Sequence, residues 1–227
     1  MQSDPITIPV DSGHIVSGLL AMPADAVACC VLAHGAGAGM THPFMAAAAD
    51  GLAVRRVATL RYQFPYMEQG SKRPDRPALA QATVHAAVAA AAGLAPGLPL
   101  FAGGKSFGGR MTSQAQAEAP LPGVRGLVFF GFPLHAAKKP SDVRAAHLSQ
   151  VALPMLFLQG TRDALAELSL LEPVVDALMP HATLSLIPDG DHSFHVPART
   201  GGSDAEVLGS MLDTVRFWID AIIAGPA

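Results

Sequence analysis

The segment AGGKSFGGR (residues 102–110) contains residue types that serve both nucleophilic catalysis and phosphate binding. It includes a G-x-S-x-G centred on Ser106, the pattern of a nucleophile on a sharp turn between a strand and a helix. Side chains two residues away would clash on such a turn, and Gly104 and Gly108 carry none. A phosphate-binding loop would need a further glycine at the position of Pro99, which lacks an N–H. The segment therefore predicts a serine nucleophile rather than a nucleotide site.

A second glycine-rich stretch, HGAGAGM (residues 34–40), directly follows the apolar run VACCVLA. It does not match a dinucleotide fingerprint, because Met40 occupies the place of the third small residue. Acyl transfer needs backbone N–H donors for an oxyanion, one just after the nucleophile and one from a loop of this kind. We expect Phe107 and Ala36 to supply them, with Gly35 letting the backbone approach a substrate. Taken alone, the stretch could also be a flexible loop.

A serine hydroxyl is a poor nucleophile unless a base accepts its proton and a carboxylate orients that base. In one widespread class of serine hydrolases, the order along the chain is serine, acid, histidine. Asp163 comes just after the apolar run PMLFLQG, and His192 lies just beyond ATLSLIP. These positions predict Asp163 as the acid and His192 as the base. The alternatives are a helix N-cap for Asp163 and a surface-loop position for His192.

Other titratable residues compete for these roles. His195 could be the base or could line the pocket. Asp189 and Asp191 could replace the acid, but a side chain from the same short loop is poorly placed to orient the imidazole. His85 and His147 lie in predicted helices, where we expect them to be structural or exposed.

Strands and helices alternate along most of the chain, and this order predicts how the candidate residues are positioned. Parallel pairing with helices on both faces of one sheet follows from the alternation, with an antiparallel hairpin at the N-terminal edge. In such sheets, reactive groups gather at the carboxyl ends of the strands. We expect a single domain over residues 1–227. Predicted strands cover residues 6–10, 15–23, 27–34, 55–62, 98–104, 126–132, 154–160 and 182–188, and predicted helices cover 44–52, 78–92, 109–117, 164–179 and 207–219.

The composition limits the classes of partner. The net charge of −3 is too small to favour a nucleic acid or an anionic membrane, and we expect neither as a partner. No apolar stretch is expected to reach the roughly 18 residues that span a bilayer, and the N-terminus does not read as a signal peptide.

Cys29 and Cys30 are adjacent in a predicted strand and so point to opposite faces, which makes a disulfide between them unfavourable. We expect reduced, buried thiols and a cytoplasmic protein.

Several motifs together resemble the α/β-hydrolase superfamily over nearly the whole chain. They are HGAGAGMTHPFM, LRYQFPYM, GGKSFGGR, GFPLH, GTRDAL and DHSFHVP. The chain looks like a dienelactone-hydrolase-related branch of small bacterial hydrolase-like proteins, similar to the testis-expressed group and to a subunit of a chromatin acetyltransferase complex. The resemblance implies a triad of Ser106, Asp163 and His192, and no metal or cofactor. Dienelactone hydrolases proper use a cysteine nucleophile, so a dienelactone substrate is not implied.

The interval between two predicted strands, residues 133–153, has room for a loop and one short helix but not for a lid domain. A shallow site of this kind suits small soluble acyl esters or thioesters as substrates. The protein would then be a serine hydrolase of the carboxylesterase type, acting as a monomer or small homo-oligomer. The alternative is a non-catalytic protein-interaction module that keeps the fold.

Candidate substrate-binding residues are Gly35, His42, Lys105 and His195. Further candidates for the mouth of the site are Arg61, Tyr66 and His135.

Overall fold

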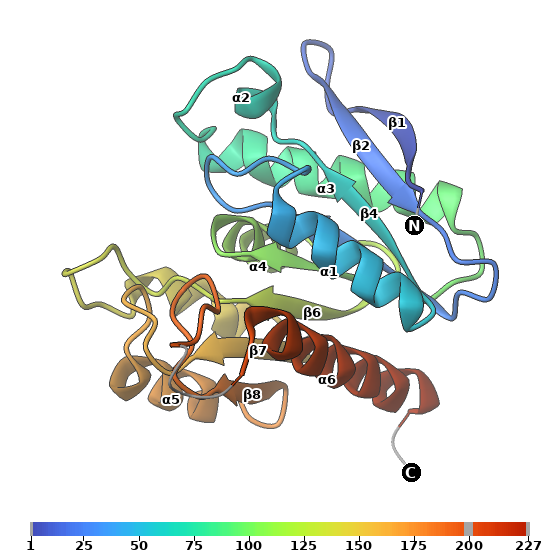
Figure 1. Ribbon diagram of the computed structural model, residues 1–227. Coiled ribbons are helices and arrows are strands. Elements are labelled where there is room, and N and C mark those ends of the chain that lie inside the picture. The colour runs from blue at the N-terminus through green and yellow to red at the C-terminus, as the bar shows by residue number, and fades with distance from the viewer. Residues whose placement is uncertain (1, 198–201, 226–227) are drawn as a thin grey trace.

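A computed structural model describes residues 2–197 and 202–225 of the chain, which form one eight-stranded sheet (Figure 1). The strand order is β1-β2-β4-β3-β5-β6-β7-β8. The first two strands form an antiparallel hairpin, β2 pairs antiparallel with β4, and every later pairing is parallel. The strands are β1 (Asp4–Pro9), β2 (Ile15–Ala21), β3 (Ala28–Ala33), β4 (Val57–Tyr62), β5 (Leu100–Lys105), β6 (Val124–Phe130), β7 (Met155–Gly160) and β8 (Ala182–Ile187). The predicted mixed sheet with an antiparallel edge is confirmed.

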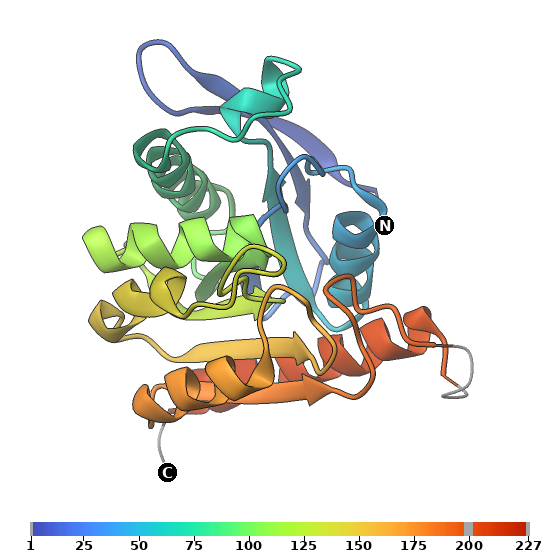
Figure 2. The same ribbon diagram turned by 90° about the vertical axis from the view of Figure 1, so that its left-hand side faces the viewer.

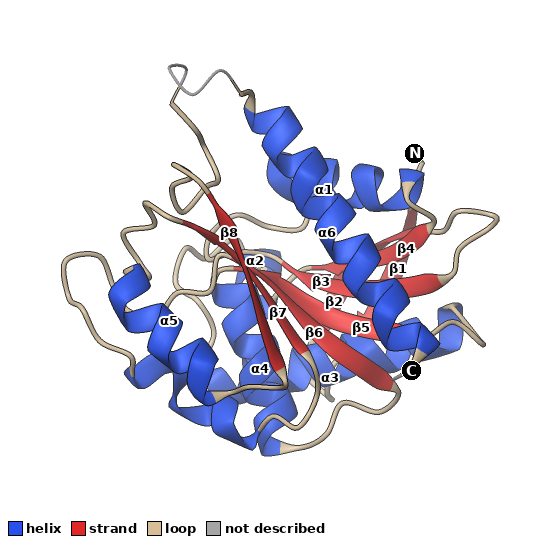
Figure 3. Cartoon of the chain, turned by 90° about the horizontal axis from the view of Figure 1, so that it is seen from below, coloured by secondary structure: helices blue, strands red, loops and turns tan. Residues whose placement is uncertain are grey.

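Helices cover both faces of this sheet, as Figures 2 and 3 show from two directions. One layer contains α1 (Pro43–Val54) and α6 (Asp204–Ala224). The opposite layer contains α3 (Pro77–Leu94), α4 (Phe107–Glu118), the 3-10 helix η1 (Val143–Gln150) and α5 (Leu168–Ala177), while the short α2 (Pro65–Glu68) follows β4. Each face of the sheet thus has its own hydrophobic core, which is the arrangement predicted from the alternating elements.

The central strand β3 shows why its sequence is apolar without interruption. All six of its residues are buried, because both faces of a central parallel strand are covered. Cys29 packs in the core beneath α3 and α4, and Cys30 packs in the core beneath α1 and α6. Both cysteines are free, and burial raises the pKa of the Cys29 thiol to about 12. The two side chains therefore point to opposite faces of the sheet, as their adjacency in a strand predicted.

One predicted helix starts later than expected, and one short helix was not predicted. The helix expected over residues 164–179 begins only at Leu168, because the segment after β7 forms turns around Asp163. The short helix α2, which no prediction covered, starts at Pro65, a residue suited to the first position of a helix.

Helix α3 corrects the expectation that no segment is apolar enough to span a bilayer. Its 18 residues have a mean hydropathy of 1.3, which is sufficient by length and composition. Its apolar residues are mainly alanines, and one face of the helix, including Val84, Ala87 and Val88, packs in the core of the fold. Length and composition do not by themselves distinguish such a core helix from a membrane helix.

The connections that follow β3, β5, β7 and β8 leave the sheet at the carboxyl ends of parallel strands. Residues 131–154, all described, connect β6 to β7 and contain η1 as their one helix or strand. The connection is therefore too small to form a lid domain over the ends of the strands.

Candidate active site

Ser106 lies at the junction of β5 and α4 in a backbone conformation that few residues adopt. Its φ is 50° and its ψ is −115°, outside the regions that L-residues favour. Residues held in such conformations cluster at functional sites, where the surrounding structure compensates for the strain. The sharp turn projects the Ser106 side chain into the pocket described below.

The glycines around Ser106 are required by the close packing of β5 and α4 on β3. A Cβ at Gly104 would collide with the carbonyl oxygen of Ala33, and a Cβ at Gly108 would meet the same carbonyl group. Gly103 is equally constrained, because a side chain there would collide with the Val128 carbonyl of β6. The G-x-S-x-G pattern therefore has the steric origin predicted from the sequence.

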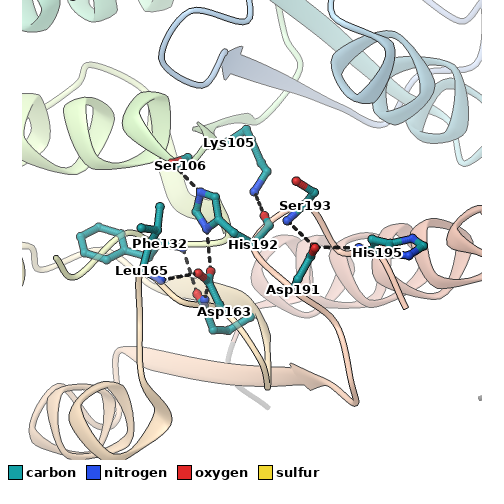
Figure 4. A network of polar contacts seen from close by, with 10 residues as sticks. Lys105, Ser106, Phe132, Asp163, Leu165, Asp191, His192, Ser193 and His195 are labelled. Atoms are coloured by element: carbon teal, nitrogen blue, oxygen red, sulfur yellow. Dashed lines mark hydrogen bonds and ion pairs between the residues drawn. The ribbon is translucent and has the colours of Figure 1, made fainter. Parts of the chain in front are cut away.

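The structure brings Ser106, His192 and Asp163 together in one hydrogen-bonded chain (Figure 4). The Ser106 Oγ lies 2.8 Å from Nε2 of His192, and Nδ1 of His192 lies 2.6 Å from Oδ2 of Asp163. With the proton on Nδ1, the imidazole donates to the carboxylate and accepts from the serine hydroxyl. The three residues come from the ends of β5, β8 and β7, so the sheet positions all of them.

Asp163 is held by groups other than His192. Its side chain is fully buried, and it accepts hydrogen bonds from Nε2 of Gln159 at 2.6 Å and from the Leu165 N–H at 2.8 Å. The same Gln159 accepts from the Phe132 N–H through Oε1 at 2.9 Å. Asp163 does not cap α5, because Glu167 occupies the N-cap position. Sequence reasoning missed Gln159, although a polar residue within an apolar strand was a signal for a buried partner.

The predicted oxyanion donors, Ala36 and Phe107, belong to the loop after β3 and to the start of α4. Ala36 lines the pocket, and Phe107 is the first residue of α4, where a helix leaves its N–H groups unpaired. Among the described residues, no acceptor bonds the Ala36 N–H. Both N–H groups are therefore available to a ligand.

Side chains from neighbouring segments hold the loop after β3. His34 is buried, donates from Nδ1 to the Gly35 carbonyl at 2.7 Å, and accepts from the Phe64 N–H at Nε2. Burial lowers the pKa of His34, which agrees with a neutral ring in these roles. The Tyr66 hydroxyl accepts from the Gly37 N–H at 2.8 Å.

A pocket of about 380 Å³ opens beside Ser106. Its lining combines the loop after β3, Ser106, His192 and apolar side chains: Gly35, Ala36, Ala38, His42, Phe44, Met45, Lys105, Ser106, Leu165, His192 and Ser193. His42 also caps α1, accepting the Phe44 N–H through Nδ1. Three of the candidate substrate-binding residues, Gly35, His42 and Lys105, thus line the pocket. The apolar lining from Phe44, Met45 and Leu165 was not foreseen.

His195 lies away from this pocket. Its side chain is 64% exposed, and Nδ1 pairs with Asp204 at the start of α6 at 2.9 Å. The structure therefore corrects the expectation that His195 lines the pocket: its ring turns toward α6. Asp191, another rival from this loop, accepts from the N–H groups of Ser193 and His195 and is not hydrogen-bonded to the His192 ring.

The remaining candidates also lie outside the pocket lining. His85 belongs to α3, and His147 belongs to η1, where Nε2 lies 2.7 Å from the Ser113 hydroxyl. Arg61, Tyr66 and His135 are buried and contribute to the supporting structure rather than to the mouth. Within residues 2–197 and 202–225, no group of three or more His, Cys, Asp or Glu side chains is arranged to hold a metal ion.

Solved structures of low sequence identity share this fold. A dienelactone hydrolase from Anabaena variabilis superposes with a TM-score of 0.78 at 22% identity, covering 96% of each chain. A serine hydrolase without a lid from Xanthomonas campestris gives 0.74 at 20% identity, covering 96% of this chain and 95% of that one. The esterase domain of a Rhodothermus marinus protein gives 0.72 at 14% identity, covering 96% and 98%.

A family model described as an alpha/beta hydrolase domain matches residues 26–220. The match begins just before β3 and ends within α6. It therefore includes all three hydrogen-bonded residues, Ser106, Asp163 and His192. The chain belongs to the α/β-hydrolase family.

Proposed function

We propose that this protein is a serine hydrolase that cleaves small soluble acyl esters or thioesters. The observation that carries the proposal is the hydrogen-bonded chain of Ser106, His192 and Asp163 on a nucleophile elbow. The names of several structural neighbours, which include esterases, agree with this class of reaction. Substrate identity is inferred from the pocket and not from those neighbours.

In the proposed reaction, the Ser106 Oγ attacks the substrate carbonyl carbon while its proton passes to Nε2 of His192. The carbonyl oxygen becomes an oxyanion that accepts hydrogen bonds from the N–H groups of Phe107 and Ala36. When the tetrahedral intermediate collapses, the bond to the leaving group breaks and His192 returns the proton to the departing alcohol or thiol. Water then attacks the acyl-enzyme by the same steps, and Asp163 keeps the imidazole oriented throughout.

The size of the pocket supports a small substrate. A volume of about 380 Å³ is at the low end of ligand pockets, and the connection between β6 and β7 supplies no lid. The walls that face Ser106 include Met45 and Leu165, which suit a short apolar acyl group.

A fluorophosphonate probe tests whether Ser106 is a nucleophile. We expect the wild-type protein to be labelled and Ser106→Ala to remain unlabelled with an unchanged circular dichroism spectrum. Ser113→Ala is a matched control, because Ser113 also pairs with a histidine, His147, but lies outside the pocket. The control should be labelled like the wild type.

A screen of p-nitrophenyl acetate and butyrate and of short acyl thioesters then identifies the reaction. Turnover that disappears in Ser106→Ala supports the proposal. Absence of both labelling and turnover in the wild type would instead favour a non-catalytic interaction module.

A further inference from the structure

Lys105 immediately precedes Ser106 and lines the same pocket, but the proposed reaction gives it no role. Its ammonium donates a hydrogen bond to the backbone carbonyl of His192 (Figure 4). Nζ also lies 4.7 Å from the centre of the Phe194 ring and 5.8 Å from that of Phe44. The side chain therefore places a cation beside the nucleophile, against aromatic walls.

Among the residues that the structure describes, no ion pair neutralises this cation. Asp163 and Asp191 are the carboxylates whose charges favour the protonated amine, and neither forms a salt bridge with Lys105. Asp163 is already bonded to His192, and Asp191 accepts from the N–H groups of the loop that follows it. None of the residues that line the pocket carries a carboxylate.

Burial without a paired carboxylate disfavours the charged form of Lys105 and lowers its pKa to about 8. At neutral pH the amine therefore remains mostly protonated. An ammonium can donate several hydrogen bonds, and the His192 carbonyl is the acceptor that the described residues provide. A bound anion would supply both the missing charge and a further acceptor.

We propose, on the basis of the hydrolase function above, that Lys105 makes the site selective for esters that carry a carboxylate a few bonds from the scissile carbonyl. The carboxylate pairs with Nζ while the carbonyl carbon lies at Ser106 Oγ. Because both residues line one pocket of about 380 Å³, the two substrate groups must also be close together. The selected substrates are thus short esters of dicarboxylic acids, or esters of short hydroxy acids.

Matched pairs of esters measure this selectivity. Monoethyl glutarate is compared with its neutral amide, ethyl glutaramate, which places a carboxylate or a carboxamide in the acyl part. The butyrate esters of glycolate and of glycolamide place the same two groups in the alcohol part. In at least one pair, kcat/KM should favour the carboxylate by about tenfold or more, the contribution of one hydrogen bond to a charged group.

Variants of Lys105 assign the selectivity to its charge. Lys105→Met should abolish the preference, so that the ratio of kcat/KM for the carboxylate to kcat/KM for the matching carboxamide approaches one, whereas Lys105→Arg should keep part of the preference. Lys139→Met, which removes an exposed lysine from the loop after β6, should behave like wild type. If Lys105→Met slows the charged and neutral esters equally, Lys105 only positions His192 and the inference is wrong. An equal preference in Lys105→Met and wild type, or no preference in either pair, would also overturn it.

Binding to Ser106→Ala separates this inference from the proposed function. Calorimetry with the same ester pairs requires no turnover, and tighter binding of the carboxylates that disappears in Ser106→Ala/Lys105→Met supports the inference even if no ester is cleaved. Turnover of neutral esters without any preference for carboxylates in binding or catalysis would leave the hydrolase function standing and refute the role of Lys105.

Discussion

His192 and His195 belong to the same short loop, but their rings have different surroundings. The His192 ring lies between Ser106 and Asp163, with its side chain 24% exposed, whereas the His195 ring faces solvent and Asp204. Both residues are histidines, and they lie close together in the chain. The direction in which each ring points therefore decides which of them can accept the serine proton.

The two histidines should accordingly differ in their effect on turnover. We expect His192→Ala to lower kcat for p-nitrophenyl acetate by about 10⁴-fold or more, as loss of the base does in serine hydrolases. His195→Ala should change kcat by less than about threefold, because exposed ion pairs contribute little. Steady-state kinetics on both variants, with folding checked by circular dichroism, measures the difference. A larger loss in His195→Ala would move the base to His195.

At the scale of elements, the segment between β4 and α3 supports the loop after β3, which contains the proposed oxyanion donor Ala36. Tyr66 accepts the Gly37 N–H, and Gln63 accepts the Met40 N–H through Oε1 at 2.8 Å. These bonds hold the backbone of the loop directly after Ala36 in place. Precise placement of oxyanion donors determines how well they stabilise the transition state.

Replacing Tyr66 by phenylalanine tests this support. The variant loses one hydrogen bond, so we expect kcat to fall by about fivefold with KM nearly unchanged, and the free energy of unfolding to fall by about 1 kcal/mol. Tyr62→Phe is the matched control, since Tyr62 is the other tyrosine of the chain and its buried hydroxyl has no hydrogen-bond partner among the described residues. Kinetics and urea unfolding give the two readouts. An equal loss of kcat in both variants would contradict a specific role for Tyr66.

Another contact between elements, between η1 and α4, predicts a dependence of stability on pH. Burial, together with the nearby charge of Arg110, lowers the pKa of His147 to about 4 from its ordinary value of 6.5. Between these values the unfolded chain binds a proton that the folded protein does not. The stabilisation is therefore present above pH 6.5 and is lost as the pH falls toward 4.

Urea unfolding at pH 7 and pH 5 measures this effect. The free energy of unfolding should decrease from pH 7 to pH 5 in the wild type and decrease less in His147→Gln. Part of the decrease should remain in the variant, because burial also lowers the pKa of His34. Identical decreases in both proteins would show that His147 does not titrate as the structure indicates.

At the scale of the whole molecule, the absence of a lid determines how the pocket meets solvent. The connection between β6 and β7 contains only η1 among its described elements, and the pocket walls come from loops at one edge of the sheet. A long acyl chain would extend beyond these walls into water. Each buried CH₂ contributes about 0.8 kcal/mol, but only while the pocket has room for it.

Hydrolysis of p-nitrophenyl esters of increasing chain length should therefore reach a maximum early. We expect the highest kcat/KM with acetate or butyrate and a decline beyond about six carbons, since later CH₂ groups gain no burial. Activity should not increase abruptly when the substrate forms micelles. A steady rise through decanoate, or activation at micelles, would reveal a deep acyl pocket and contradict the small-ester assignment.

The sequence by itself determined the order of the elements and the positions that can carry the reaction. Two local patterns can be recognised in the sequence alone. They are the glycines at 104 and 108 around Ser106, and the polar residues just beyond apolar runs. They sufficed to predict Asp163 and His192, because the carboxyl ends of parallel strands necessarily meet at one edge of a sheet. The limits of α5 were predicted less well, since helix ends depend on contacts with other segments.

Only the tertiary structure decided which of these groups touch. Gln159, buried in β7, donates a hydrogen bond to Asp163 just beyond the end of the strand. The His195 ring pairs with Asp204, the first residue of α6. Lys105 is next to Ser106 in sequence, but its acceptor, the His192 carbonyl, comes from the far end of the sheet. The direction of a side chain depends on backbone torsions and on the packing of segments distant in sequence. Residue types and their spacing specify neither these torsions nor this packing.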